Sequence, residues 1–318
     1  AADLSSMAAA LRLLVPVDQT VGVLFFVIVI ALSEILIPYH RYAKVLRWLC
    51  LSLLAYVAVM FVAQVDWGEV ALHTVLPQIN PTKQTFSLLI ALAGTTISPY
   101  LFFWQAAEEV EERKAEGLTP NSSVGVNDGH IRAMRGDVAA GMITGVTIMF
   151  AIMVTAAATL NRNGITNIQS AEDAAQALRP IAGDFAGLLF LFGILGVGLL
   201  SIPVLAGSTA YALAETFGWR ESLELAPRQA RAFYAVIVAS MAVALLLNLL
   251  AIPPMYFLFL AAVLNGLSAP ILMVIVYVLA RRTNLLGKWA SPWWSKALLM
   301  LAILAMFALP LLWLASPS

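Results

Sequence analysis

Charged residues are scarce in this chain: they make up 11% of its 318 residues, whereas apolar residues make up 61%. A soluble domain carries about 25% charged residues, so we exclude a soluble globular protein. Lysine plus arginine and aspartate plus glutamate number 18 each, and the formal net charge is zero. The chain therefore lacks the basic surplus of a nucleic-acid-binding protein, and we exclude nucleic acid as a partner.

Cysteine and histidine are nearly absent as well. The one cysteine, Cys50, excludes a disulfide framework and any cysteine-built zinc or iron–sulfur site. The three histidines, His40, His73 and His130, lie in expected loops or at span ends without the spacing of metal ligands. The chain also lacks a nucleophile elbow and an HExxH helix, so we expect neither an enzyme nor a bound cofactor.

Long apolar runs are abundant. A helix needs about 20 residues to cross about 30 Å of hydrocarbon, and most of these runs reach that length. The expected spans are residues 1–15 (partial), 21–38, 45–65, 86–107, 137–160, 184–217, 232–251, 255–280 and 297–314. We expect an all-α integral membrane protein with one transmembrane domain over residues 1–318. The chain begins without methionine and inside an apolar run, which predicts a cut N-terminus.

The positive charges are unevenly divided between alternate connections. One set of alternate connections between the spans holds Arg12, Lys83, Arg162 and Arg179. The other set of connections holds the remaining fourteen of the eighteen lysine and arginine residues. Cytoplasmic loops carry an excess of lysine and arginine, so the second set is expected inside. The asymmetry supports the span count and the orientation of a multi-pass protein in the lipid bilayer. We expect that membrane to be a bacterial plasma membrane.

The most informative span contains its own helix breakers. Gly94 and Pro99 bracket the hydroxyls of Thr95, Thr96 and Ser98 close to mid-membrane. Pro99 has no amide hydrogen, so a carbonyl about one turn earlier loses its partner. Transporters place ion sites at such discontinuous helices. A simple proline kink healed by threonine side chains is the alternative, and on these residues the two are about evenly matched.

Two further patterns concern helix interruption and packing. Asn265, Ser268 and Pro270 interrupt a later span and predict a second break, with a packing kink as the equal alternative. Gly141 and Gly145 are spaced for close approach of two membrane helices, which we favour over any nucleotide-binding interpretation.

A charged group lies in the first apolar run. Asp3 is ionisable at a depth where such groups are rare and usually paired. Arg228 and Arg231 open a later span at the inner face and are its candidate partners. Together they would form an inner-side polar network; the alternative is that the arginines are anchors reaching toward the interface.

These motifs resemble a known family. GTTISPYLFFWQAAEEVEER resembles the sixth helix of the Nramp (natural resistance-associated macrophage protein) family of divalent-metal transporters. AADLSSMAAALRLL is similar to the end of the third helix of that family, and LNGLSAPIL is similar to the tenth. The likeness runs from Ala1 to about Arg282. It implies the LeuT-type inverted-repeat transporter fold, N-terminally truncated, with the first two helices of the family preceding Ala1.

The resemblance implies a metal site that has diverged. Ser98 stands where the family has methionine, Thr95 stands where it has a carbonyl-donating alanine, and Pro99 is kept. Tyr100 replaces the family histidine, and Ser268 lies near the position of a glutamine ligand. The metal ligands implied in this chain are therefore Thr95, Ser98 and Ser268, and the Asp and Asn ligands of the first helix would precede Ala1.

The proton route of the family is altered too. Asp3 matches its third-helix aspartate, while Ser6 falls where a glutamate is expected. Arg228 and Arg231 are similar to the basic residues that pair with that aspartate. Because Tyr100 and Ser6 do not titrate near neutral pH, the resemblance implies that proton coupling is interrupted. Nramp-related magnesium transporters show similar substitutions.

We therefore expect a carrier of divalent cations as substrate. With Ser98 in place of the family methionine, the site has no thioether to select soft metals, so we expect Mn²⁺ and Mg²⁺ to be favoured over softer metals. Three alternatives stay open: a proton-coupled Mn²⁺/Fe²⁺ symporter of the ordinary type, an amino-acid or organic-solute transporter of the same fold, and a non-transporting membrane scaffold. The sequence gives no oligomeric state.

Overall fold

The computed structural model describes residues 1–12, 15–37, 48, 54–62, 65–115, 128–161, 164, 184–223, 225–250 and 252–316. Every regular element in these residues is a helix. The chain divides into two compact units: the first joins Ala1–Leu72 to Phe103–Met255, and the second joins His73–Phe102 to Tyr256–Ser318. Each unit is treated by itself below.

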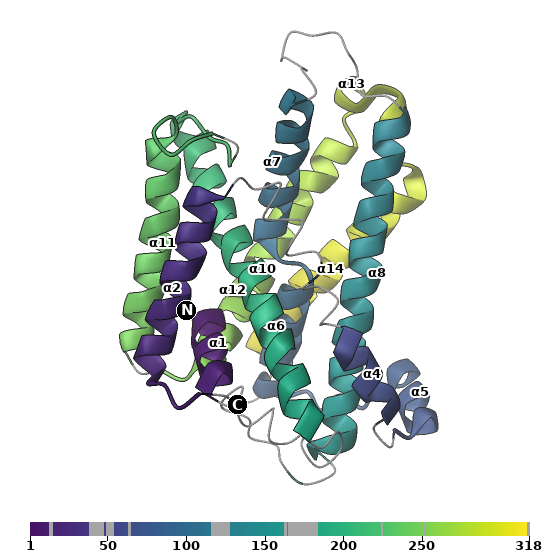
Figure 1. Ribbon diagram of the computed structural model, residues 1–318. Helices are drawn as coiled ribbons and strands as arrows, with labels where there is room; N and C mark the ends of the chain where they lie inside the picture. Colours follow the sequence, from purple (N-terminus) through teal and green to yellow (C-terminus); the bar gives the residue numbers. More distant parts are fainter. Residues whose placement is uncertain are drawn as a thin grey trace. The chain divides into compact units, whose positions relative to one another are not determined.

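The helices follow one another along the chain as Figure 1 shows. They are α1 (Ala2–Arg12), α2 (Gln19–Leu36), α4 (Leu54–Val62), α5 (Trp67–Val75), α6 (Lys83–Thr96), α7 (Pro99–Ala115), α8 (Asp128–Thr159), α10 (Asp184–Phe217), α11 (Arg231–Leu249), α12 (Pro254–Ala280), α13 (Thr283–Leu286), the short 3₁₀ helix η3 (Gly287–Trp289) and α14 (Trp293–Ala315).

The described residues contain seven helices long and apolar enough to cross a membrane. Expected spans 21–38, 184–217, 232–251, 255–280 and 297–314 correspond to α2, α10, α11, α12 and α14 within a few residues. Of the expected span 45–65, the helix α4 covers Leu54–Val62, and residues 45–47, 49–53 and 63–64 lie outside the described part. The partial first span is the 11-residue helix α1.

Two helices differ from expectation because their ends are polar. α8 begins at Asp128, nine residues before the expected span 137–160, since its first turns carry charged residues that hydropathy does not detect. α5 was not expected; the Asp66 carboxylate accepts hydrogen bonds from the amides of Gly68 (3.0 Å) and Glu69 (3.1 Å) and caps its start. Asp18 caps α2 and Thr82 caps α6 in the same manner.

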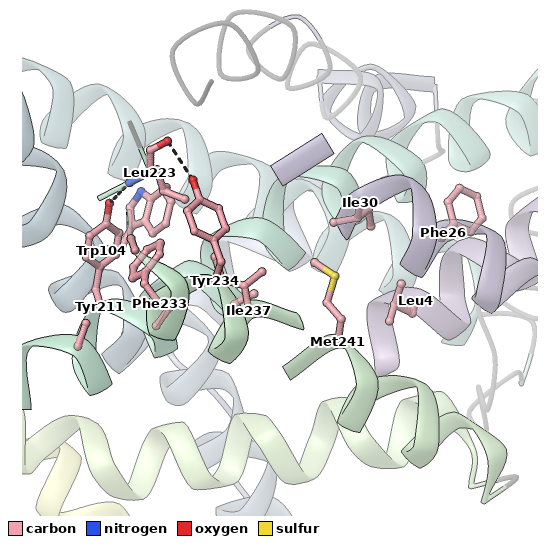
Figure 2. Close-up of a cluster of buried hydrophobic side chains, with 14 of the residues drawn as sticks. Leu4, Phe26, Ile30, Trp104, Tyr211, Leu223, Phe233, Tyr234, Ile237 and Met241 are labelled. Atoms are coloured by element: carbon pink, nitrogen blue, oxygen red, sulfur yellow. Dashed lines mark hydrogen bonds between the residues drawn. The ribbon is translucent and has the colours of Figure 1, made fainter. Parts of the chain in front are cut away.

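The first unit has a buried core built mainly from α1, α2, α10 and α11. Figure 2 shows aliphatic side chains such as Leu4, Ile30 and Met241 at one end of this core and an aromatic group at the other. α1 lies close to α10, because a Cβ atom at Gly198 would overlap the side chain of Met7. This close approach brings the polar side of α1 against α10.

The Gly141 and Gly145 pair does not have the packing role expected from its spacing. A Cβ atom built at either glycine would meet no described atom within 4 Å. That face of α8 is open in the described part of the chain, which corrects the expectation of a close helix contact there.

Candidate functional site

The span expected at residues 86–107 is interrupted. α6 ends at Thr96 and α7 begins at Pro99, and between them Ile97 leaves the helical conformation with φ −114° and ψ 76°. The Ile97 amide still donates to the Ala93 carbonyl at 2.8 Å, and the Ser98 carbonyl accepts from the Leu101 amide at 3.1 Å. The first position of a helix needs no amide hydrogen, so proline is favoured there. Pro99 therefore cannot continue α6 but fits the first position of α7.

The hydroxyl of Ser98 points back at the carbonyls that the interruption frees. Ser98 is only 6% exposed, and its Oγ lies 3.2 Å from the Gly94 carbonyl oxygen and 3.2 Å from the Thr95 carbonyl oxygen. A hydroxyl has one proton and two lone pairs, so the two carbonyls share one donor, and among the described residues no group donates to the Oγ lone pairs. Three oxygens thus converge within one helical turn, which is a donor set suited to a hard cation.

The neighbouring threonine hydroxyls do not join this group. The hydroxyl of Thr95 and that of Thr96 each donate to the Leu92 carbonyl at 2.8 Å. The part of Thr95 that lies beside Ser98 Oγ is therefore its backbone carbonyl and not its hydroxyl. Tyr100 is half-buried in the first turn of α7.

Gly94 has a packing role that the sequence analysis missed. A Cβ atom there would overlap the Ala262 carbonyl and the Gly266 amide of α12, and one at Gly266 would overlap the Ile90 carbonyl of α6. The two helices touch backbone to backbone just before the interruption. Small residues permit such contacts in membrane proteins, and Gly266, inside the LNGLSAP motif, was the available signal.

The second break is not present. α12 is continuous from Pro254 to Ala280 and passes through Pro270. Ser268 is exposed, and its hydroxyl donates to the carbonyls of Leu264 (2.9 Å) and Asn265 (3.2 Å) in its own helix. Serine side chains and close neighbours re-satisfy the backbone around membrane prolines. The packing alternative therefore describes this motif, and no interruption presents Ser268 to a ligand.

Asp3 has a different partner from those expected. The Ser201 hydroxyl on α10 donates to Asp3 Oδ2 at 2.7 Å. At the same end of α1, the side-chain amide of Asn248 donates to the Ala1 carbonyl at 3.1 Å. Arg231 opens α11 and Asn248 lies at its other end, roughly 25 Å away at 1.5 Å per residue. Within the described residues, the structure does not bring Asp3 together with Arg231 or with the preceding, exposed Arg228.

A buried carboxyl group was also missed. Glu34 in α2 is 8% exposed, and its Oε2 has no hydrogen-bond partner among the described residues. One glutamate inside an apolar run was a visible signal. The same residues contain no group of three or more His, Cys, Asp or Glu side chains placed to hold a metal.

These features define a helical multi-span membrane protein with an interrupted span. The family model described as natural resistance-associated macrophage protein-like matches residues 1–316. The chain therefore belongs to the Nramp family, whose members are LeuT-fold membrane transporters and not enzymes.

Curated relatives agree with this assignment. The chain is 30% identical over 158 residues to the divalent metal cation transporter MntH of Caldanaerobacter subterraneus subsp. tengcongensis, covering 49% of this chain and 36% of the relative. It is 26% identical over 157 residues to the MntH of Clostridium acetobutylicum, covering 49% and 35%. It is 27% identical over 180 residues to that of Klebsiella pneumoniae, covering 55% and 41%. The chain thus matches well under half the length of these relatives.

Proposed function

We propose that this chain belongs to a divalent-cation transporter of the bacterial plasma membrane and holds the substrate at the α6–α7 interruption. The observation that carries the proposal is the buried Ser98 hydroxyl, whose proton is shared between the Gly94 and Thr95 carbonyls and whose lone pairs accept no hydrogen bond from the described residues. The names of the relatives, divalent metal cation transporters, support the same substrate class. Discontinuous membrane helices hold ions in this manner in secondary transporters.

The ligand chemistry favours hard cations. Hydroxyl and carbonyl oxygens suit Mn²⁺ and Mg²⁺, whereas a thioether would select softer metals. Mg²⁺ keeps several of its bound waters, and these waters fill part of its coordination shell. A site for a partly hydrated Mg²⁺ therefore needs few protein ligands. Thr95 and Ser98 are the ligands we propose in this chain. Ser268 is left out because it is exposed and lies on a continuous helix, whereas Ser98 is buried at an interruption.

Transport without proton coupling is the form we favour. Tyr100, at the start of α7, does not titrate near neutral pH, and Asp3 is hydrogen-bonded to Ser201 instead of to an arginine. Alternating access would come from rocking of the interrupted helices against the rest of the fold.

The experiment is ion uptake by the full-length protein in liposomes that enclose a pH-sensitive dye. We expect both Mn²⁺ and Mg²⁺ to enter without acidification of the interior. Entry of Mn²⁺ alone with strong proton influx would contradict this form and support the ordinary proton-coupled symporter. Absence of any divalent uptake would overturn the proposed function itself.

An organic solute is the weaker alternative. Transporters of this fold aim the amide groups of a half-helix at a substrate carboxylate. At the start of α7, however, the Leu101 amide is already bonded to the Ser98 carbonyl. Labelled amino acids should therefore fail to compete with Mn²⁺ for the purified protein, and effective competition would favour the organic substrate.

A further inference from the structure

The half-helix that follows the interruption is held at two points by α10 in the first unit. The first point is Trp104 of α7, which is buried. A Cβ atom at Gly207 would lie 2.5 Å from the Trp104 ring, so the glycine provides the space that the indole occupies. The ring also packs edge-on against Tyr211, with centroids 6.2 Å apart.

The second point is a hydrogen-bond junction at the Tyr211 hydroxyl. This hydroxyl donates to Glu111 Oε1 of α7 at 2.6 Å and accepts from the Leu223 amide at 3.2 Å. Tyr211 is 2% exposed. A short bond from a buried hydroxyl to a carboxylate is among the stronger hydrogen bonds in proteins. One side chain therefore joins α7, α10 and the connection that precedes α11.

Aromatic packing holds the Tyr211 ring in place. Its centroid lies 4.8 Å from that of Phe233, which in turn lies 5.5 Å from that of Tyr234. The Tyr234 hydroxyl bonds to the Leu225 carbonyl at 3.0 Å and reaches the Leu223 carbonyl at 3.5 Å. Figure 2 shows these rings gathered around Leu223. The Tyr211 hydroxyl can therefore be removed by a change to phenylalanine without removing the packing of the Tyr211 ring.

The spacing of the two points restrains two rigid-body motions of α7, rotation about its axis and sliding along it. Trp104 and Glu111 are seven residues apart and so lie on one face, two turns from each other. Gly207 and Tyr211 are four residues apart on the facing helix. Two contacts separated along the axis resist both rotation of α7 about its axis and sliding along it.

We propose that Tyr211 and Glu111 are positioning residues for the cation site. Neither touches the cation; they fix the rotation of α7, whose first residue directly follows Ser98, and so fix the direction of the Ser98 lone pairs. An uninterrupted helix transmits this restraint from Glu111 to Pro99. The inference rests on the proposed function, because it assumes that the oxygens at the interruption hold the transported ion.

The transport test separates affinity from turnover in liposomes. Tyr211→Phe is expected to raise the KM for Mn²⁺ several-fold, with the maximal rate per folded transporter unchanged. Glu111→Gln keeps an acceptor oxygen and is expected to stay near the wild-type KM, whereas Glu111→Ala should match Tyr211→Phe. Tyr234→Phe is the control, because it removes a buried hydroxyl of the same aromatic group whose bonds go to Leu223 and Leu225.

A KM for Tyr211→Phe equal to that of Tyr234→Phe would overturn the inference, and so would a loss confined to the maximal rate. Failure of the proposed function is a different result, namely no Mn²⁺ uptake by the wild-type protein. Hydrogen exchange of the α7 peptide gives a second readout that needs no transport. We expect faster exchange in the first turns after Pro99 in Tyr211→Phe and not in Tyr234→Phe; equal exchange would show that the hydroxyl does not hold α7.

Discussion

At the scale of single residues, a serine beside a proline donates its hydroxyl proton to carbonyls of the preceding helical turn in two places. Ser98 donates to carbonyls ahead of Pro99, and Ser268 donates to carbonyls ahead of Pro270. The difference is burial: Ser98 is buried at a real interruption, and Ser268 is exposed on a continuous helix. The sequence places both serines next to a proline, but it does not reveal which of them is enclosed.

Glu221, in the connection after α10, should make stability depend on pH. Burial raises its pKa above the usual value near 4.5, the carboxylates of Glu215 and Glu111 add to this, and Lys114 opposes it. The folded protein then holds the Glu221 proton more tightly than the unfolded chain. Its stabilising contribution is complete below about pH 4.5 and is lost as the pH rises through the raised pKa.

The variant Glu221→Gln removes this titration. We expect its melting temperature in detergent to rise relative to the wild type as the pH increases from about 4 to 8. A difference between the two proteins that stays constant over this range, or that shrinks with pH, would contradict the assignment.

At the scale of the elements, apolar length predicted most helices and proline chemistry predicted where one could be interrupted. The same chemistry predicted either a second interruption or a packing kink at Pro270. The helix α12 is continuous there, with Gly266 packed against α6 and the Ser268 hydroxyl bonded to the Asn265 carbonyl. The partners Ser201 and Tyr211 lie far along the chain from Asp3 and Glu111. Such pairings arise from tertiary packing and leave no periodic signal in the sequence.

The backbone contact between α6 and α12 gives a packing prediction. Gly94→Ala and Gly266→Ala each place a methyl group against backbone atoms that cannot move aside, so we expect each to destabilise the protein by roughly 1–3 kcal/mol. Thermal unfolding in detergent measures this. Gly141→Ala and Gly145→Ala are the matched controls, since their methyl groups meet nothing within 4 Å. Equal stability of the two pairs of variants would contradict the close contact.

At the scale of the whole molecule, the distribution of positive charge predicts orientation. The connection that follows α12 carries Arg281, Arg282 and Lys288, whereas the connection between α5 and α6 has no lysine or arginine and Lys83 is the first residue of α6. The positive-inside rule then puts the first connection in the cytoplasm and the second outside. Family membership over residues 1–316 and seven membrane-length helices agree with a multi-pass protein.

Cysteine labelling tests this orientation. In a protein whose one cysteine, Cys50, is replaced by serine, Gln78→Cys and Asn284→Cys each introduce a thiol at an exposed position. A membrane-impermeant thiol reagent added to intact cells should label Gln78→Cys and should leave Asn284→Cys unlabelled until the membrane is opened. The reverse pattern would contradict the orientation.

The central claim is that the α6–α7 interruption holds a divalent cation through Ser98, and Ser98→Met tests it most directly. The measurement is the ratio of Cd²⁺ to Mg²⁺ uptake by the full-length protein in liposomes, with Ser87→Met on α6 as the matched control. A thioether at the site should raise this ratio at least tenfold, while the control stays near wild type. An unchanged ratio in a folded, transporting Ser98→Met protein would remove Ser98 from the site and contradict the account.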